Sequence, residues 1–204
     1  MKRYLGIDIG TTSLKAAVFD KDGNRLGLRS FDYTLDTDNK SGYIEFAPEK
    51  YIEMCKQAIA ELRSECGEIE ALSVDTQGET LILTDENGKP LYPAVVWLDN
   101  RATSEADAIK NRFGNAKLYS VTGQPEITAG WPASKLLWFK NNKPEIFAAT
   151  KKIFMLEDWI LYGLTGNFVT EPTIQSSTTY YDVVNKIMAG IWRELIDYME
   201  VKRV

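Results

Sequence analysis

The sequence predicts an α/β fold in which an antiparallel meander of three strands is flanked by helices. An apolar run leads to Asp8, a second β-rich run ends at Asp20, and residues 25–31 alternate as a third strand. Pro48 then opens a run with apolar residues at helical spacing, and Gly67 is placed to end it. We expect this helix to lie across one face of the sheet.

The turn between the first two strands carries the residue types of an anion site. Gly10 is expected to adopt backbone angles that other residues avoid, which would let the turn approach a ligand closely. Free N–H groups and hydroxyls would then form a concave pocket for phosphate oxygens. Three consecutive residues supply those hydroxyls: Thr11, Thr12 and Ser13.

Two charged residues flank this turn. Asp8, at the end of the first strand, would suit a Mg²⁺ ion that keeps most of its waters and bridges to nucleotide phosphates. Lys15 adds a positive point charge for the same phosphates. The alternative is an ordinary β-hairpin whose turn is rich in glycine and threonine.

The middle of the chain predicts two polar corners. Residues 32–47 are polar and form a connecting excursion, and residues 69–74 form a short strand that ends at a corner containing Gln77. A hairpin follows, and residues 93–98 form a strand that leads to Asp99 and Arg101. Because ligands of open α/β sheets collect beyond strand ends, substrate is expected at these two corners.

The rest of the chain is predicted to be mainly helical. Helices are expected from about residue 102 to Gly114, from Pro132, briefly from Pro144, and over residues 156–164 and 190–199, with a strand at 153–155. The sequence has no internal repeat and no linker-like segment, so residues 1–204 are predicted to form one domain.

Composition excludes several classes of function. The chain has 24 basic against 29 acidic residues, net charge −5 and no long run of like charge, which argues against a general nucleic-acid or membrane-surface role. It contains no histidine, which excludes Ser-His and Cys-His triads. Cys55 and Cys66 would lie about 16 Å apart along one helix and cannot pair. The chain shows no secretory leader or membrane span, so a cytoplasmic location is expected.

Four segments together resemble the N-terminal lobe of the FGGY family of carbohydrate kinases, in the family's order. They are GIDIGTTSLKAAVFD (6–20), SVDTQGETLILTDENGKPLYPAVVWLDNRA (73–102), PASKLLWFKNNKPE (132–145) and EDWILYGLTGNFVTEPTIQSSTTYYD (157–182). The stretches WLDNR (97–101) and LTG (164–166) are most similar to the xylulose-kinase-like branch. The resemblance implies a ribonuclease-H-like lobe with a mixed sheet, as in actin and the Hsp70 ATPase domain.

The resemblance also implies roles for particular residues. Asp8 matches the acidic residue near metal and nucleotide phosphates, and residues 11–13 match hydroxyls that contact phosphate. The corner that touches substrate hydroxyls matches Gln77, Gly78 and Glu79. Gly78 stands where glycerol kinases place arginine, and Glu79 stands where xylulose kinases often have histidine, so the identity of the substrate stays open.

Four further residues are candidates for substrate binding, each with a plainer alternative. Trp97 and Trp131 could offer apolar walls to the C–H face of a sugar, or they could belong to the core. Asp99 and Arg101 could bind substrate, or they could form an ion pair within the domain.

The resembled family transfers the γ-phosphoryl group of ATP to a hydroxyl of a sugar or polyol, with Mg²⁺ neutralising the developing charge. A xylulose-like ketose or a polyol is the expected acceptor. In that family a second, C-terminal lobe carries the general base and the adenine pocket, so this lobe alone is expected to be inactive. Without that lobe an apolar face would be exposed, which allows a homodimer.

Two other functions remain open from the sequence. The chain could be a non-catalytic carbohydrate-binding or regulatory module, although Asp8 and the hydroxyls at 11–13 speak against a pure binder. It could also be a ribonuclease-H-like nuclease with metals at Asp8 and Asp75. The acidic charge balance argues against this nuclease.

Overall fold

The first sheet is mixed, as predicted. The computed structural model describes residues 2–188. Its first sheet has the order β3-β2-β1-β6 and consists of β1 (Arg3–Ile9), β2 (Ser13–Asp20), β3 (Arg25–Asp32) and β6 (Ala71–Thr76). β1 pairs antiparallel with β2 and parallel with β6, while β2 pairs antiparallel with β3. The expected three-stranded meander is therefore confirmed.

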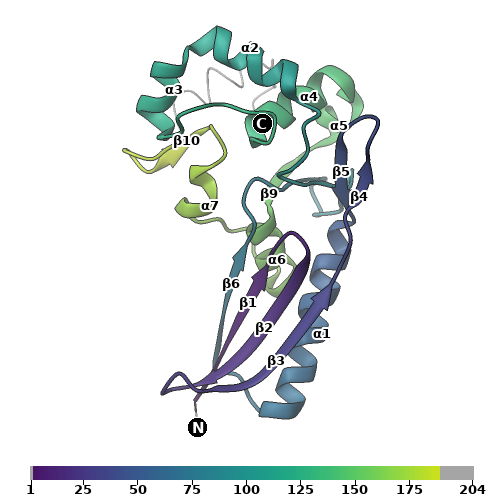
Figure 1. Cartoon of the computed structure of the whole chain (residues 1–204), viewed down its shortest axis with the longest axis vertical. Coiled ribbons are helices and arrows are strands. Elements are labelled where there is room, and N and C mark those ends of the chain that lie inside the picture. Colours follow the sequence, from purple (N-terminus) through teal and green to yellow (C-terminus); the bar gives the residue numbers. More distant parts are fainter. Residues whose placement is uncertain (1, 189–204) are drawn as a thin grey trace.

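Helix α1 (Pro48–Cys66) covers one face of this sheet, as expected (Figure 1). It begins at Pro48, ends before Gly67 and buries Tyr51, Cys55, Ala58 and Leu62. Helix α6 (Leu156–Thr165) packs beside α1 and against β6. Apolar residues of β1, β2, α1 and α6 form one core cluster. Both cysteines are free, as the helical spacing requires.

The prediction of an irregular excursion over residues 32–47 is wrong. β4 (Asp36–Asp38) and β5 (Tyr43–Phe46) form a hairpin there. This hairpin joins a second sheet with β8 (Ala94–Val95), β7 (Leu81–Thr84) and β9 (Lys152–Met155), in the order β4-β5-β8-β7-β9. β4 is a polar edge strand of three residues and β5 has only four residues, and such short segments give too little pattern to reveal a strand.

The predicted hairpin after the first polar corner is confirmed by the antiparallel pair β7 and β8. β8 is shorter than the strand expected over residues 93–98, because the chain turns after it. The Asp99 N–H donates to the Val96 carbonyl at 3.0 Å, and this turn carries Trp97 away from the sheet.

The remaining chain is mainly helical, as predicted. It contains α2 (Thr103–Phe113), α3 (Asn115–Thr122), α4 (Pro132–Asn142), α5 (Pro144–Ala149), α7 (Pro172–Ser176) and the hairpin β10 (Tyr181–Asp182) with β11 (Ile187–Met188). α3, α7 and this hairpin were not predicted. The helix expected over residues 190–199 lies outside the described residues. No helix among the described residues is long and apolar enough to cross a membrane.

The two halves of the molecule meet where the parallel strands end. In Figure 1 the first sheet and α1 extend toward the N-terminus, while α2, α3 and α4 lie at the opposite end. A second core cluster joins α2 and α4 to β7, β8 and β9. The C-terminal ends of β1 and β6 both point toward this helical half (Figure 1).

We expect Gly163→Ala to weaken the contact between α6 and α1. An added Cβ would lie 2.3 Å from Ile52 Cδ1 and 2.6 Å from Ile52 Cγ1. Overpacking costs about 1 to 3 kcal/mol, which exceeds the roughly 1 kcal/mol by which a helix favours alanine over glycine. Urea denaturation should show a lower free energy of unfolding.

The same substitution in an Ile52→Ala background should be neutral or stabilising, since the clash is gone. Gly6→Ala is the control, because no heavy atom lies within 4 Å of the Cβ it would add. Equal losses from Gly163→Ala in both backgrounds would contradict this packing.

Candidate active site

Parallel pairing brings the two predicted polar segments together. Asp8 lies opposite Asp75, and Ile9 opposite Thr76, so β1 and β6 end side by side. Beyond the last pair, the Gln77 N–H donates to the Ile9 carbonyl at 2.9 Å. The turn after β1 and the corner after β6 are therefore neighbours.

The turn after β1 is held by its own backbone and by Tyr33. The Gly10 N–H donates to the Ser13 carbonyl at 3.0 Å, and the Tyr33 N–H donates to the Thr12 carbonyl at 3.0 Å. The Tyr33 hydroxyl donates to the Gly10 carbonyl. The expectation that Gly10 uses a conformation closed to other residues is wrong: it has no positive φ, and a Cβ would meet only the Ser13 carbonyl at 3.6 Å.

Thr11 joins the turn after β1 to the corner after β6. Its hydroxyl accepts from Trp97 Nε1 at 3.1 Å and donates to Gln77 Oε1 at 3.2 Å. Gln77 Nε2 in turn donates to the buried Tyr51 hydroxyl at 3.3 Å. The Thr11 hydroxyl proton is therefore used in the hydrogen bond to Gln77. The other two hydroxyls of the turn belong to Thr12, which is exposed, and Ser13, which is half-buried.

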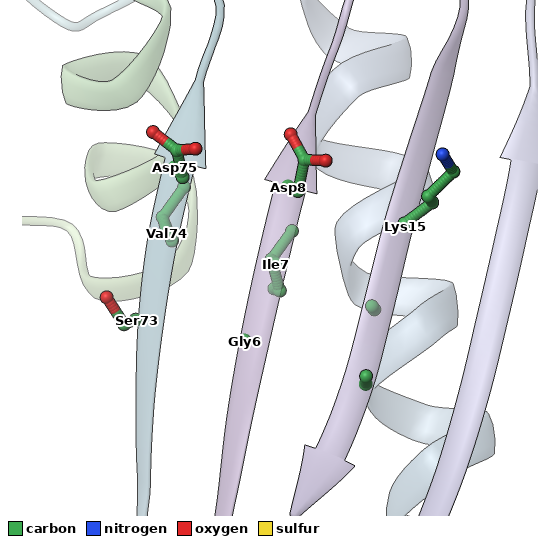
Figure 2. A pocket seen from close by; sticks show the side chains of 9 residues that line it. Gly6, Ile7, Asp8, Lys15, Ser73, Val74 and Asp75 are labelled. Carbon is green, nitrogen blue, oxygen red and sulfur yellow. The ribbon is translucent and has the colours of Figure 1, made fainter. Parts of the chain in front are cut away.

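Three charged side chains line the face of the sheet opposite α1. Asp8 lies opposite Lys15 in the antiparallel pair and opposite Asp75 in the parallel pair, and all three are exposed. Figure 2 shows the three side chains near the strand ends, above a hollow of about 300 Å³. The hollow is open, its charges lie at one end, and the rest of its lining comes from glycine, alanine, isoleucine, valine and serine residues.

The corner after Gln77 contains a strained residue. Glu79 has φ of 55°, and the Thr80 N–H donates across it to the Gly78 carbonyl at 2.8 Å. This is a three-residue turn of the rare kind with positive φ at its centre. The Glu79 carbonyl accepts a hydrogen bond from the buried Lys135. The Glu79 side chain is half-buried.

Asp99 and Arg101 form the ion pair that was the alternative to substrate binding. Both side chains are fully buried, with Arg101 Nη2 2.8 Å from Asp99 and 2.6 Å from Glu45. Asp99 also accepts from the Ile44 N–H at 2.6 Å, so the group ties β5 to the turn after β8. Burial lowers the pKa of Arg101, but hydrogen bonds to Asp99 and Glu45 outweigh it and raise that pKa.

The two tryptophans lie in different surroundings. Trp97 is 40% exposed and hydrogen-bonded to Thr11, whereas Trp131 packs against the core cluster around α4. Trp131 Nε1 is buried and has no hydrogen-bond partner among the described residues. The preceding residue, Gly130, approaches Trp97 so closely that a Cβ would lie 2.7 Å from the Trp97 carbonyl oxygen.

The structure thus brings some predicted residues together and separates others. Thr11, Gln77 and Trp97 form one bonded group, and Asp8 and Lys15 lie on the neighbouring sheet face. The sequence interpretation missed Tyr33, Tyr51 and Lys135. Of these only Lys135 carried a signal, as a lysine inside the apolar helical run PASKLLWF.

Comparison with known proteins identifies the family of this chain. Residues 3–198 match the model of the FGGY family of carbohydrate kinases, N-terminal domain. The chain belongs to this family. It is 34% identical over 190 residues to the xylulose kinase of Lactococcus lactis, covering 91% of this chain and 37% of that protein. It is 32% identical over 194 residues to the glycerol kinase of Thermococcus gammatolerans, covering 90% and 38%.

Solved structures show the same fold. The ligand-bound xylulose kinase of Lactobacillus acidophilus matches all of this chain and 41% of its own, with 30% identity and a TM-score of 0.90. The gluconate kinase of the same species matches 98% of this chain and 40% of its own, with 30% identity and a TM-score of 0.89. This FGGY chain spans about two fifths of the length of such relatives. The predicted ribonuclease-H-like α/β lobe and the predicted family are confirmed.

We expect Thr11→Val to disconnect the turn from the corner. Valine keeps the shape but leaves Trp97 Nε1 and Gln77 Oε1 without their partner, which costs about 1 kcal/mol because both groups are partly solvated. Urea denaturation should show this loss, and Thr11→Ser should restore stability. Thr12→Val is the matched control on the exposed neighbour. Equal stability of the valine and serine variants at position 11 would argue against the link.

Proposed function

We propose that this chain is the sugar-binding lobe of an ATP-dependent kinase that phosphorylates a hydroxyl of a xylulose-like ketose or a polyol. The observation that carries the proposal is the hydrogen-bond chain through Thr11. It links a phosphate-type turn directly to a corner with an amide, a carboxylate and an indole, so that a phosphoryl donor and an alcohol acceptor would lie side by side.

The residues divide into two groups of roles. Gln77 and Glu79 would bind substrate hydroxyls, since an amide and a carboxylate can pair with a diol, and Gly78 leaves room beside them. Trp97, partly exposed, would cover an apolar face of the sugar. Trp131 would support that face from behind. Asp99 and Arg101 would not contact substrate themselves. Their buried ion pair would hold the turn that carries Trp97 in place.

The phosphate group of ATP would meet the turn after β1. Backbone N–H groups near Gly10, the hydroxyls of Thr12 and Ser13, and the Lys15 ammonium would bind its oxygens. In this interpretation Thr11 orients the turn and does not bind phosphate, because its hydroxyl proton already donates to Gln77.

The carboxylates present fit Mg²⁺ held in the manner usual for nucleotide sites. Among residues 2–188 no cluster of three or more acidic, histidine or cysteine side chains could hold a metal alone. Mg²⁺ of nucleotide sites instead keeps several waters and uses one or two carboxylates with substrate phosphates. Exposed Asp8 would supply that carboxylate, and the ion would neutralise charge on the transferred phosphoryl group.

A second lobe would complete the site. The relatives are more than twice as long, and the hollow beside Asp8 is open on the face opposite α1. That face also exposes Tyr4, Phe19 and Leu28, which alternate with buried neighbours. We propose that a C-terminal lobe covers this face, supplies the general base and excludes water, and that a chain lacking it pairs with a second copy instead.

Calorimetry on the chain with a panel of ketoses, polyols and aldonates tests the division of roles. Glu79→Ala should weaken binding of the preferred sugar about tenfold or more, since a charged hydrogen-bond partner is lost. Asp8→Asn should leave sugar affinity unchanged and weaken binding of Mg-ATP. Glu53→Ala, at an exposed position of α1, is the control for loss of a carboxylate.

Two results would count against the kinase. Absence of binding to every sugar in the panel would refute a sugar site at this corner. Sugar binding that Mg-nucleotide leaves unaffected, in a protein that carries the second lobe, would favour the non-catalytic carbohydrate-binding module.

The intact mass of the native product in cell extract tests the second lobe. We expect a product of roughly the length of the relatives, or a separate chain that co-purifies and restores phosphoryl transfer. A native product that ends at Val204 and transfers no phosphate with any partner would refute the kinase assignment.

A further inference from the structure

Lys135 is a buried cation whose bonds all go to backbone carbonyls. It lies near the start of α4, and its side chain is fully buried. Nζ donates to the carbonyls of Glu79 at 2.8 Å, Val96 at 2.9 Å and Val95 at 3.3 Å. An ammonium group has three protons, so each proton has an acceptor.

These carbonyls belong to the two corners of the proposed sugar site. Glu79 is the centre of the turn between β6 and β7, while Val95 is the last residue of β8 and Val96 follows it immediately before Trp97. One ammonium therefore joins the turn at Glu79 to the end of β8, in addition to the pairing of Leu81 with Val95 between β7 and β8. It does so from behind, since it contacts only their backbone and is closed to solvent.

Strain at Glu79 shows that this corner needs external support. A non-glycine residue at φ of 55° inside a three-residue turn is a sparsely populated conformation. Such conformations persist only where the surroundings hold them, and they cluster at binding sites. The hydrogen bond to the charged Lys135 is the contact that fixes the Glu79 carbonyl on its inner side.

We propose that Lys135 is a positioning residue that fixes Glu79 and Trp97 at the spacing in which their side chains bind one sugar. The assignment rests on the proposed sugar-binding function. Lys135 itself does not touch substrate, and its effect passes through the two backbone corners.

The protonation state of Lys135 gives this arrangement a signature. Burial lowers the pKa of Lys135 to about 7, while the charges of Asp99 and Glu79 raise it and Arg101 lowers it further. Below that pH the ammonium donates to all three carbonyls. Above it the neutral amine has two protons, so one carbonyl loses its donor. The turn at Glu79 should therefore be more stable when the pH is below the pKa of Lys135 and less stable when the pH is above it.

We call the three hydrogen bonds of Lys135 Nζ the clamp. Amide hydrogen exchange by NMR tests the clamp without any sugar. The reporter is the Thr80 amide, which bonds across Glu79, and the internal control is the Gly166 amide at the end of α6. In the wild-type chain the Thr80 protection factor should fall about tenfold as pH rises through the pKa of Lys135, the size expected for losing one charged hydrogen bond. Gly166 protection should stay constant.

Lys135→Met should give low Thr80 protection at every pH, without a step. Lys56→Met, at an exposed position of α1, is the matched control and should behave as wild type. Unchanged Thr80 protection in Lys135→Met would overturn the clamp. If that variant does not fold, the wild-type profile decides, and a profile without a step would overturn it.

Sugar affinity, measured by calorimetry over the same pH range, tests positioning. Wild type should bind more tightly below the pKa of Lys135, and Lys135→Met should bind about tenfold more weakly, independently of pH. If Lys135→Met shows low Thr80 protection but binds the sugar as tightly as wild type, the positioning role is overturned. A wild-type chain that binds no sugar would instead refute the proposed function, and the exchange data would still decide the clamp.

Discussion

Parallel pairing of β1 with β6 is the constraint on which the site depends. A parallel neighbour requires a crossover connection, and the chain supplies one that contains α1, which then covers one face of the sheet. The pairing places Asp8 beside Asp75 and brings the two following loops together. The other face stays uncovered among the described residues, and it carries the charges that a phosphoryl-transfer site would use.

Polar contacts within the protein then set the geometry of these loops. A chain of hydrogen bonds runs from Thr11 to Gln77 and on to Tyr51, because a polar group withdrawn from water needs a hydrogen-bond partner. The same requirement explains Lys135, whose three protons meet three carbonyls, and the buried group of Asp99, Arg101 and Glu45. Two buried cations thus act at the C-terminal end of β8: Lys135 binds the carbonyls of Val95 and Val96, and Arg101 binds Asp99 in the turn that follows.

Much of the fold followed from the sequence because its signals are local. An apolar run and a β-rich run indicated β1 and β2, alternation indicated β3, Pro48 and Gly67 bounded α1, and Pro132 and Pro144 opened α4 and α5. The hairpin of β4 and β5 was missed because β4 is polar and exposed and both strands are too short to show a period. Short elements such as α7 were missed because five residues give too little pattern. The family, too, was evident in the order of the motifs.

The sequence by itself determined which residue types stand at the proposed phosphate and sugar sites, because Asp8, the hydroxyls at 11–13 and the corner at 77–79 lie at or just beyond strand ends. Only the tertiary structure decided how they are used. It committed Thr11 to Gln77 and Trp97, buried Asp99 with Arg101, and brought Lys135 of α4 to Glu79. Such contacts join residues far apart in the chain, and hydrogen-bond partners across that distance depend on packing, which no local pattern records.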